Sequence, residues 1–299
     1  YDEQFGNCDD GPFDCPFGGL RDDGASADLG IFASVLWRAL AFGCDRRLFT
    51  RYRELCDWPL DLDFRLFAAR IWVFSRMNFL SAEQIHRLKN PGERVAVLLR
   101  HAERRHITPE DADHGSFVPL TDKGREQALA AGKELSLFQG SKFFGSSPVF
   151  RCRETAAQIS RGMDCQEFSD PEKVAHLQPL AEFYVDDFEA YKRHLIEGFY
   201  PAICKWIDEG RLEGFVPVKE GSEALLQFLF DHSHADFNLF CSHDAWIVPF
   251  VSHFTGIRFT PSLWLNFLSG AVVFYKPENP VQSAQIYPLK ILGDGFLRF

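Results

Sequence analysis

The sequence predicts an α/β fold, a three-layer sandwich with a mostly parallel central sheet flanked by helices, plus an N-terminal helical extension. Beyond residue 90, short apolar runs alternate with segments whose apolar residues recur every three or four positions. A length of 299 residues with 46% hydrophobic content is sufficient for one large domain or two small ones. Asn90-Pro91-Gly92 breaks the chain between the two patterns. We therefore predict an N-terminal region, 1–90, and an α/β domain, 91–299.

The N-terminal region has two parts of different composition. Residues 1–25 are rich in Gly, Asp and Cys without any period, which predicts a loop or irregular arm. Residues 27–88 have helical periodicity. This region is expected to be a lid, an extra helical layer or a surface for a protein partner or for self-association.

The second region predicts alternating strands and helices. The expected strands are 94–99, 142–145 and 237–241, with a terminal pair at 270–276 and 284–289. The expected helices begin after an N-cap at Thr121 and cover 151–161, 187–209, 221–232 and 244–254. An insert is expected at about 165–218. The C-terminal "GDGFLRF" is interpreted as a turn.

Composition and charge exclude several function classes. The formal net charge of −10 does not attract nucleic acid or an anionic membrane surface. No apolar run reaches the roughly 20 residues that span a bilayer. We expect no nucleic-acid and no membrane partner, and an anionic substrate would require a local cluster of cations.

Eight cysteines are too sparse for a disulfide scaffold. Cys152 and Cys241 lie in apolar or motif contexts, where a reduced thiol behaves as a small hydrophobe. Reduced thiols and a cytoplasmic location are therefore expected. Because the sequence starts at Tyr1 rather than Met, an exported form without its signal peptide stays open, and Cys8 and Cys15 would then be able to pair.

Three predicted strands end in polar residues that carry chemistry. The first ends in Arg100-His101, and the last in Ser242-His243-Asp244. The middle strand is followed by Ser146-Ser147-Pro148 and a helix that opens near Arg151. In open α/β sheets the ligand crevice lies beyond the carboxyl ends of the strands. If the strands are parallel neighbours, one place collects Arg100, His101, Arg104, Arg151 and His243.

Such a cluster suits a phosphoryl group. Arginine presents a planar fork of donors that matches phosphate oxygens, and a helix start adds backbone donors. A neutral imidazole can attack phosphorus, while the remaining cations stabilise charge on the transferring group. A carboxylic acid must then protonate the leaving oxygen. This chemistry needs no cofactor. No metal site is predicted, and His232 and His234 in "DHSHAD" are assigned to a polar turn before a strand.

Four motifs occur in a diagnostic order: "LLRHAER", "LTDKGREQALAAG", "SSPVFRCRETA" and "SHDAWIVPF". Together they resemble the histidine phosphatase superfamily, with the phosphoglycerate-mutase-like or histidine acid phosphatase fold, from about residue 94 to 254. The resemblance implies that His101 is the phosphorylated nucleophile. It also implies a phosphate pocket formed by Arg100, Arg104, Arg151 and His243, with Ser147 beside them. Ala102 stands where the family usually has Gly.

The general acid has more than one candidate. One branch of the family uses a Glu between the second and last motifs, whereas the acid-phosphatase-like branch uses the Asp of a His-Asp pair. His243-Asp244 favours the second arrangement, so Asp244 is ranked ahead of Glu182 in "PLAEFYVDD". Glu103 lies between pocket residues and is equally able to orient Arg104.

The resulting prediction is a phosphoric monoester hydrolase that acts on a small phosphorylated substrate through a phosphohistidine. "RHAERRHI" differs from the pattern typical of mutases, which favours hydrolysis over phosphoryl relocation. The alternative is a catalytically weak, phosphatase-like module that binds a phosphorylated ligand or protein partner. Substrate identity would be read by loops and inserts, and these carry no signature.

Overall fold

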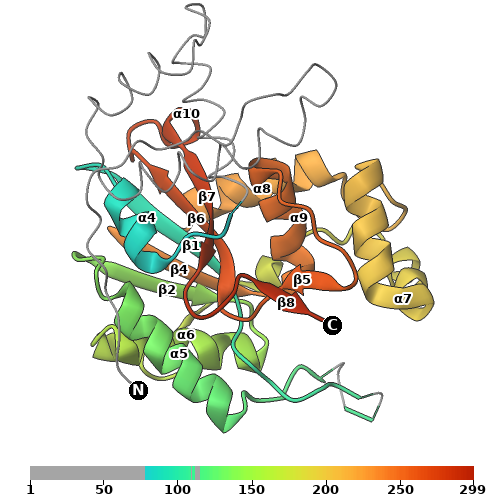
Figure 1. The fold of residues 1–299 in the computed structure, drawn as a ribbon, viewed down its shortest axis with the longest axis horizontal. Helices are drawn as coiled ribbons and strands as arrows, with labels where there is room; N and C mark the ends of the chain where they lie inside the picture. The colour runs from blue at the N-terminus through green and yellow to red at the C-terminus, as the bar shows by residue number, and fades with distance from the viewer. Residues whose placement is uncertain (1–77, 109, 112–114) are drawn as a thin grey trace, which may run out of the picture. The chain divides into compact units, whose positions relative to one another are not determined.

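The computed structural model describes residues 78–108, 110–111 and 115–299. The chain divides into two compact units, Tyr1–Ile71 and Trp72–Phe299, and the described residues belong to the second. Most of the predicted N-terminal region, with Cys8 and Cys15, lies outside the described residues. Figure 1 shows a central sheet with helices on both faces.

The central sheet has six strands in the order β3-β2-β4-β1-β6-β7. Strands β3, β2, β4 and β1 pair in parallel, and β6 is antiparallel to both of its neighbours, β1 and β7. This arrangement confirms the predicted α/β class with a mostly parallel sheet. The strands are β1 (Arg94–Arg100), β2 (Lys142–Ser146), β3 (Ala175–His176), β4 (Phe237–Ser242), β6 (Ser269–Tyr275) and β7 (Gln285–Lys290).

Strand β1 is buried on both faces because its sequence is a continuous apolar run. Its side chains alternate between two apolar clusters. Val95, Val97 and Leu99 join one cluster, and Ala96 and Leu98 join the other. The run therefore fixes β1 at the centre of the sheet.

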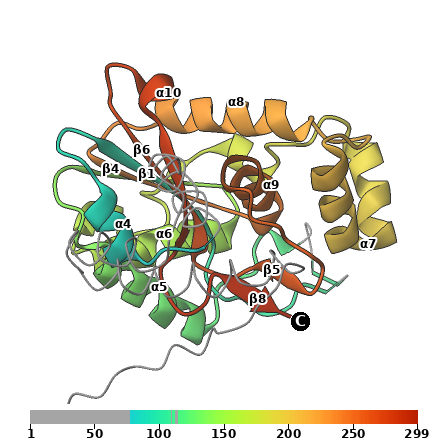
Figure 2. The ribbon, with the colours of Figure 1, turned by 45° about the horizontal axis from the view of Figure 1, so that its top comes forward.

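Helices cover both faces of the sheet (Figures 1 and 2). The apolar cluster that contains Val95, Val97 and Leu99 includes residues of α4 (Ala82–Leu88), α5 (Asp122–Leu135) and α6 (Phe150–Gly162). The cluster that contains Ala96 and Leu98 includes residues of α7 (Phe188–Glu209), α8 (Val218–Asp231) and α9 (Asp244–Thr255). Short elements complete this part of the chain: η2 (Gln166–Phe168), η3 (Gln178–Ala181) and α10 (Pro280–Ser283). The three-layer prediction is thus confirmed.

Local capping signals act as the sequence predicts. The Thr121 hydroxyl accepts from the backbone N–H of Gly124 and starts α5. Asp187 accepts from two backbone N–H groups at the start of α7. Helix α7 is interrupted at Gly198, whose φ of 133° is open to glycine and strained for other residues. The predicted helix at 187–209 therefore consists of two helical segments.

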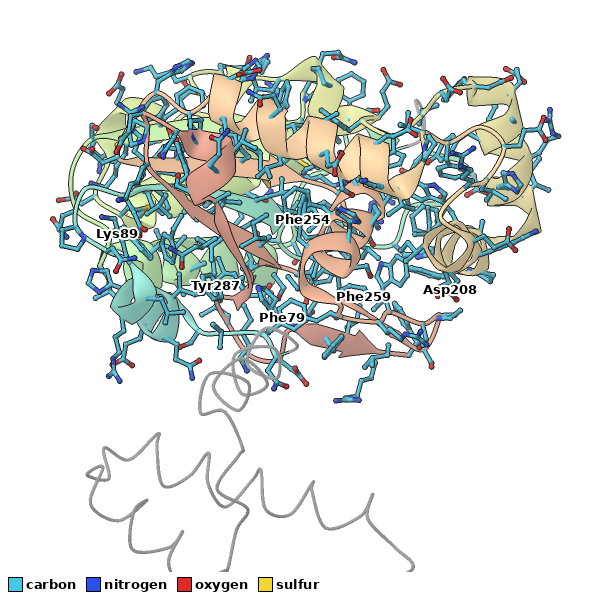
Figure 3. All side chains as sticks on the ribbon, turned by 90° about the horizontal axis from the view of Figure 1, so that it is seen from above. Phe79, Lys89, Asp208, Phe254, Phe259 and Tyr287 are labelled. Atoms are coloured by element: carbon cyan, nitrogen blue, oxygen red, sulfur yellow. The ribbon has the colours of Figure 1, made fainter. Side chains whose placement is uncertain are left out.

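The structure places the residues before Asn90 differently from the predicted boundary. Leu80 exchanges backbone hydrogen bonds of 2.9 Å with Pro288 and Lys290 of β7. Phe79 packs its ring on Phe259, with centroids 6.5 Å apart (Figure 3). Its ring centroid is 5.0 Å from that of Phe296. Pro91-Gly92 is therefore a turn inside one compact unit, because pairing with a distant strand holds the segment before it.

A second difference concerns the C-terminus. Residues 293–299, predicted to be a turn, include β8 (Phe296–Arg298), which pairs antiparallel with β5 (Leu263–Leu265). The strand is three residues long and its partner is about 30 positions away, so no local period marks it. Across the residues that the structure describes, no helix is long and apolar enough to cross a membrane.

Candidate active site

His101 follows the last residue of β1, and one nitrogen of its ring is held by a backbone carbonyl. Its backbone N–H donates to the carbonyl of Ser242 at 3.1 Å, which ties it to the end of β4. Its Nδ1 lies 2.8 Å from the carbonyl of Ala102. A carbonyl only accepts, so Nδ1 carries the proton and the lone pair is on Nε2. This is the tautomer that a nucleophilic imidazole requires.

Electrostatics keep this imidazole neutral. Burial lowers the pKa of His101 well below its ordinary value, and the neighbouring charges of Arg151, Arg100 and His243 lower it further. The ring is 2% exposed. Its lone pair is therefore available at and below neutral pH.

His243 stands opposite at the start of α9 and is held from two sides. Nη2 of Arg151 lies 3.2 Å from Nδ1, and Oγ of Ser147 lies 3.0 Å from Nε2. An arginine only donates, so Nδ1 accepts and Nε2–H donates to Ser147. The centroids of the His101 and His243 rings are 5.7 Å apart. The structure therefore brings together the two histidines, Arg151 and Ser147, as the sequence predicts.

The guanidiniums of Arg100 and Arg151 are anchored at their tips. Arg100 donates to the carbonyl of Leu265 and lies 3.0 Å from Oδ2 of Asp244. Its Cζ also lies 4.3 Å from the ring centroid of Phe267. Arg151 donates from Nη1 to the carbonyl of Gly115 at 2.9 Å. These contacts orient both side chains before any ligand binds.

Arg104 belongs to the same electrostatic group. Its pKa is lowered to about 10 by burial and by the charges of Arg151 and Arg100, while the charge of Asp244 acts to raise it. It therefore stays protonated at neutral pH. Its Nη1 donates to the carbonyl of Arg105 at 2.7 Å.

All three pocket arginines share one feature. The Nε of Arg100, Arg104 and Arg151 is buried, and none has a hydrogen-bond partner among the described residues. An unpaired buried donor costs free energy. Three such donors around two imidazoles are suited to an anion.

Asp244 is held as a carboxylate. Burial opposes its charge, but Arg100, the indole N–H of Trp264 and His243 outweigh it, so its pKa lies below the ordinary value. The Trp264 Nε1 donates to Oδ2 at 2.9 Å. A carboxylate in this setting accepts hydrogen bonds and orients Arg100.

Glu182 is exposed at the end of η3, in a segment tied to the same strand end. Oγ of Ser242 donates to the carbonyl of Leu180, and Nε1 of Trp246 donates to that of Ala181, each at 2.7 Å. These two donors flank His243-Asp244 in the sequence. The backbone at Glu182 is therefore held beside the cluster of arginines and histidines, and its side chain is not buried within that cluster.

Glu103, the third carboxylate that the sequence singles out, faces elsewhere. Its carboxylate accepts from Nζ of Lys123 at 2.7 Å and from Oγ1 of Thr121 at 3.2 Å. It is thus bound at the start of α5.

Thr155 contributes more than its position on a helix suggests. Its hydroxyl accepts from the backbone N–H of Ala102 at 3.0 Å and donates to the carbonyl of Arg151 at 2.7 Å. The residue follows Arg151 by four positions, so both lie on one helix face. That spacing is the signal that would have identified it, whereas Trp264 and Phe267 carry no local signal.

Comparisons with known proteins identify the family. The sequence model of the histidine phosphatase superfamily (branch 1) matches residues 96–278, more than half of the chain. Solved structures similar to this chain include phosphoglycerate mutase from Bacillus anthracis str. Sterne, with 14% identity over 66% of this chain and 93% of that one, at a TM-score of 0.43. A mycobacterial glucosyl-3-phosphoglycerate phosphatase has 16% identity over 67% of this chain and 100% of that one, at 0.45. No curated protein matches the chain. From the family match, the chain belongs to the histidine phosphatase superfamily.

Proposed function

We propose that the chain hydrolyses a phosphate monoester through a phosphohistidine on His101. The observation that carries this proposal is the neutral His101 ring, with its lone pair on Nε2, beside the buried Arg100 and Arg151 and the partly buried Arg104. Membership of the superfamily supports phosphatase-type chemistry in general.

The reaction has two steps. Nε2 of His101 attacks phosphorus, the bond from phosphorus to the ester oxygen breaks, and a carboxylic acid protonates that oxygen. Water then attacks the phosphohistidine, the P–N bond breaks, and phosphate leaves. Arg100, Arg104 and Arg151 donate to the phosphoryl oxygens in both steps, and the Nε2–H of His243 exchanges the Ser147 hydroxyl for one of these oxygens.

Charge balance favours a monoester. Three guanidiniums and the carboxylate of Asp244 leave an excess of two positive charges beside the neutral His101 ring. A phosphate monoester carries close to two negative charges at neutral pH. A diester carries one and would leave a buried cation uncompensated.

Glu182 is our proposed proton donor, and Asp244 is the anion that orients Arg100. A general acid must be protonated before the chemical step, whereas the contacts of Asp244 with Arg100 and Trp264 favour its ionised form. The sequence ranks Asp244 first. Its ion pair supports the opposite order.

The phosphohistidine is tested with an aryl phosphate and rapid acid and alkali quenching. The wild-type chain should release phosphate and carry a phosphoryl group that is labile in acid and stable in alkali. His101→Asn should lose both, with turnover falling by at least about 10³-fold. Undiminished turnover in this variant would overturn the proposal. Tight phosphate binding without turnover of any ester would instead identify a binding module.

The acid is tested by comparing two leaving groups. A nitrophenolate leaves without a proton, whereas an alkoxide requires one, and general acid catalysis is worth about 10²–10⁴-fold. Glu182→Gln should therefore affect the alkyl phosphate far more than the nitrophenyl phosphate. Asp244→Asn should reduce both rates by a similar factor. The reverse pattern would return the acid role to Asp244.

A further inference from the structure

Arg100 is held at three places by one short segment, residues 265–268, which runs from the end of β5 to the start of β6. Its Nη1 donates to the carbonyl of Leu265, and its Cζ lies over the ring of Phe267, 4.3 Å from the centroid. Its backbone carbonyl accepts from the N–H of Leu268 at 3.2 Å. The segment thus contacts the tip, one face and the backbone of the same arginine.

Asn266 fixes the backbone that carries Phe267. The N–H of Asn266 donates to the carbonyl of Gly295 at 2.9 Å, and its Nδ2 donates to the carbonyl of Asp294 at 2.8 Å. Its Oδ1 accepts from the N–H of Phe267 at 2.9 Å. The Phe267 ring is therefore in place before a ligand binds, because its backbone is tied to a second segment of the chain.

Leu268, the next residue, has a strained backbone. Its φ is 55°, and among the described residues other than glycine only Asp164 shares a positive φ. Its side chain is 1% exposed in the apolar cluster that includes residues of α5 and α6. Such strain persists only where the surrounding structure maintains it, and it gathers at functional sites. Here it lets Leu268 fill the cluster while Phe267 lies over Arg100.

These contacts leave the Nε of Arg100 for a ligand. Nη1 is bonded to Leu265 and Nη2 lies 3.0 Å from Oδ2 of Asp244, whereas the buried Nε has no partner among the described residues. The guanidinium is planar, so turning its plane turns the N–H of Nε with it. The ring of Phe267 stands against that rotation, and its centroid is 5.8 Å from that of His101, the proposed nucleophile.

We propose that Phe267 is a positioning residue, which holds Arg100 so that its Nε faces the phosphoryl group. The effect on turnover rests on the proposed function, whereas the effect on phosphate binding does not. A guanidinium over an aromatic face is attracted by the ring quadrupole, and desolvation strengthens the attraction. Arg100 is 4% exposed, so the contact is stronger here than at the surface. An aliphatic side chain would fill the space without this attraction.

The first test compares two variants of Phe267 with a matched control. Phe267→Leu removes the ring, Phe267→Tyr keeps one, and Phe254→Leu changes a partly buried ring at the far end of α9. Titration calorimetry measures the Kd of inorganic phosphate, and kcat/KM is measured with an aryl phosphate. Phe267→Leu should weaken phosphate binding and lower kcat/KM by about 3- to 30-fold. Phe267→Tyr should restore most of this loss, and Phe254→Leu should match the wild type.

The second test asks whether the ring acts through Arg100. In the Arg100→Met background, Phe267→Leu should change the phosphate Kd by less than about twofold, because the guanidinium it positions is gone. In the Arg151→Met background, Phe267→Leu should keep its full effect. Urea unfolding shows whether each variant is folded, and the comparison of Phe267→Leu with Phe267→Tyr does not depend on the double variants.

A wild-type phosphate Kd in Phe267→Leu would overturn the proposal, even if the variant unfolds more easily in urea. An equal loss in Phe267→Tyr, or a full effect of Phe267→Leu without Arg100, would overturn it too. Calorimetry needs no turnover. If the wild-type chain binds phosphate and hydrolyses no ester, the proposed function fails, while the phosphate Kd of the variants still tests the role of Phe267.

Discussion

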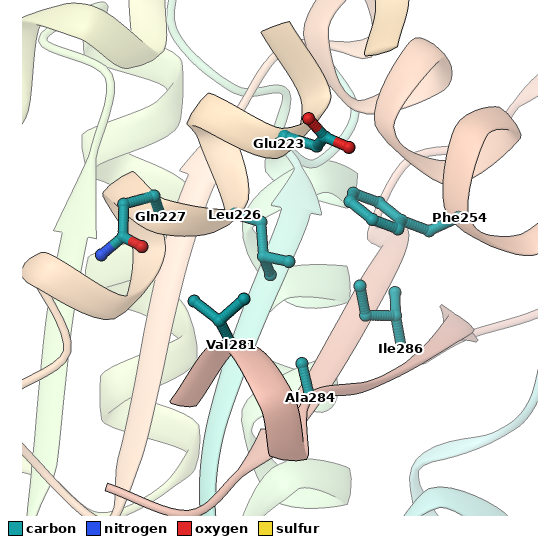
Figure 4. Close-up of a pocket in the computed structure, with 7 residues that line it drawn as sticks. All are labelled: Glu223, Leu226, Gln227, Phe254, Val281, Ala284 and Ile286. Atoms are coloured by element: carbon teal, nitrogen blue, oxygen red, sulfur yellow. The ribbon is translucent and has the colours of Figure 1, made fainter. Parts of the chain in front are cut away.

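The two ends of α9 differ in the kind of site they offer. At its start, Asp244 and His243 contact the buried side chains of Arg100 and Arg151. At its other end, Phe254 borders a hollow of about 470 Å³ (Figure 4). The lining of the hollow carries a single charged side chain and consists of Glu223, Leu226, Gln227, Phe254, Val281, Ala284 and Ile286. Convergent donors, rather than the size of a hollow, mark the place where chemistry is expected.

The helix itself contributes to this difference. Backbone dipoles place partial positive charge at the start of α9, beside the proposed phosphate pocket, and partial negative charge at its end. The helix ends with Gly256 in the left-handed region, at φ 75°. The hollow therefore lies near the end that repels an anion.

Among variants that keep His101, the largest effect should come from a cation of the cluster. Arg151→Met removes the donor to His243 and the buried Nε, and should lower kcat/KM for a phosphate monoester by about 10²–10³-fold. Arg153→Met is the matched control, two residues along the same helix. Arg153 pairs with the exposed Glu172 and also has a buried Nε without a partner among the described residues, so the two variants differ in the contact with His243. An equal loss of kcat/KM in both variants would mean that the contact of Arg151 with His243 is not required for turnover.

The next effect concerns pH. At pH 5.5 a histidine with an ordinary pKa of about 6.5 is roughly 90% protonated, which would cost a nucleophile about tenfold in rate. The lowered pKa of His101 predicts a neutral ring at that pH. Phosphate esters gain a proton near pH 6, so ring NMR, with His101→Asn for assignment, is the cleaner measurement. Titration of His101 near pH 6.5 would contradict the prediction.

The same shift has a consequence for stability. Below about pH 6.5 the unfolded chain binds a proton at this histidine and the folded chain does not, so folding weakens as the pH falls. The slope from this group approaches about 1.4 kcal/mol per pH unit. His101→Asn should remove that part of the acid dependence in urea unfolding.

A smaller effect on turnover is expected at Thr155. Thr155→Val leaves the N–H of Ala102 without its acceptor and should lower the free energy of unfolding by about 1–3 kcal/mol. Turnover should fall only a few-fold, because His101 keeps its other contacts. Thr155→Ser retains the hydroxyl and serves as the control. If the two variants are equally stable in urea, the hydroxyl does not hold the His101 segment.

The same contrast explains what could be predicted from sequence. The parallel strands and the convergence of His101, Arg151 and His243 follow from local periodicity and from a general rule about strand ends. The partners of Asp244 could not be predicted in this way. Adjacency in the sequence places Asp244 beside His243, but Trp264 reaches it only through the fold. The pairing of Leu263–Leu265 with Phe296–Arg298 is likewise non-local and too short to have a period.

The smallest effects should come from the hollow at the end of α9. Twelve residues of helix separate its two ends by about 18 Å. At that distance, unit charges interact by about 0.2 kcal/mol in water, before salt screens them beyond a Debye length of about 8 Å. Glu223→Gln should therefore change kcat/KM by less than about twofold, and Gln227→Ala should change it no more. A loss of tenfold in either variant, with unfolding unchanged, would show that α9 couples the hollow to His243, and the two ends would then form one functional unit.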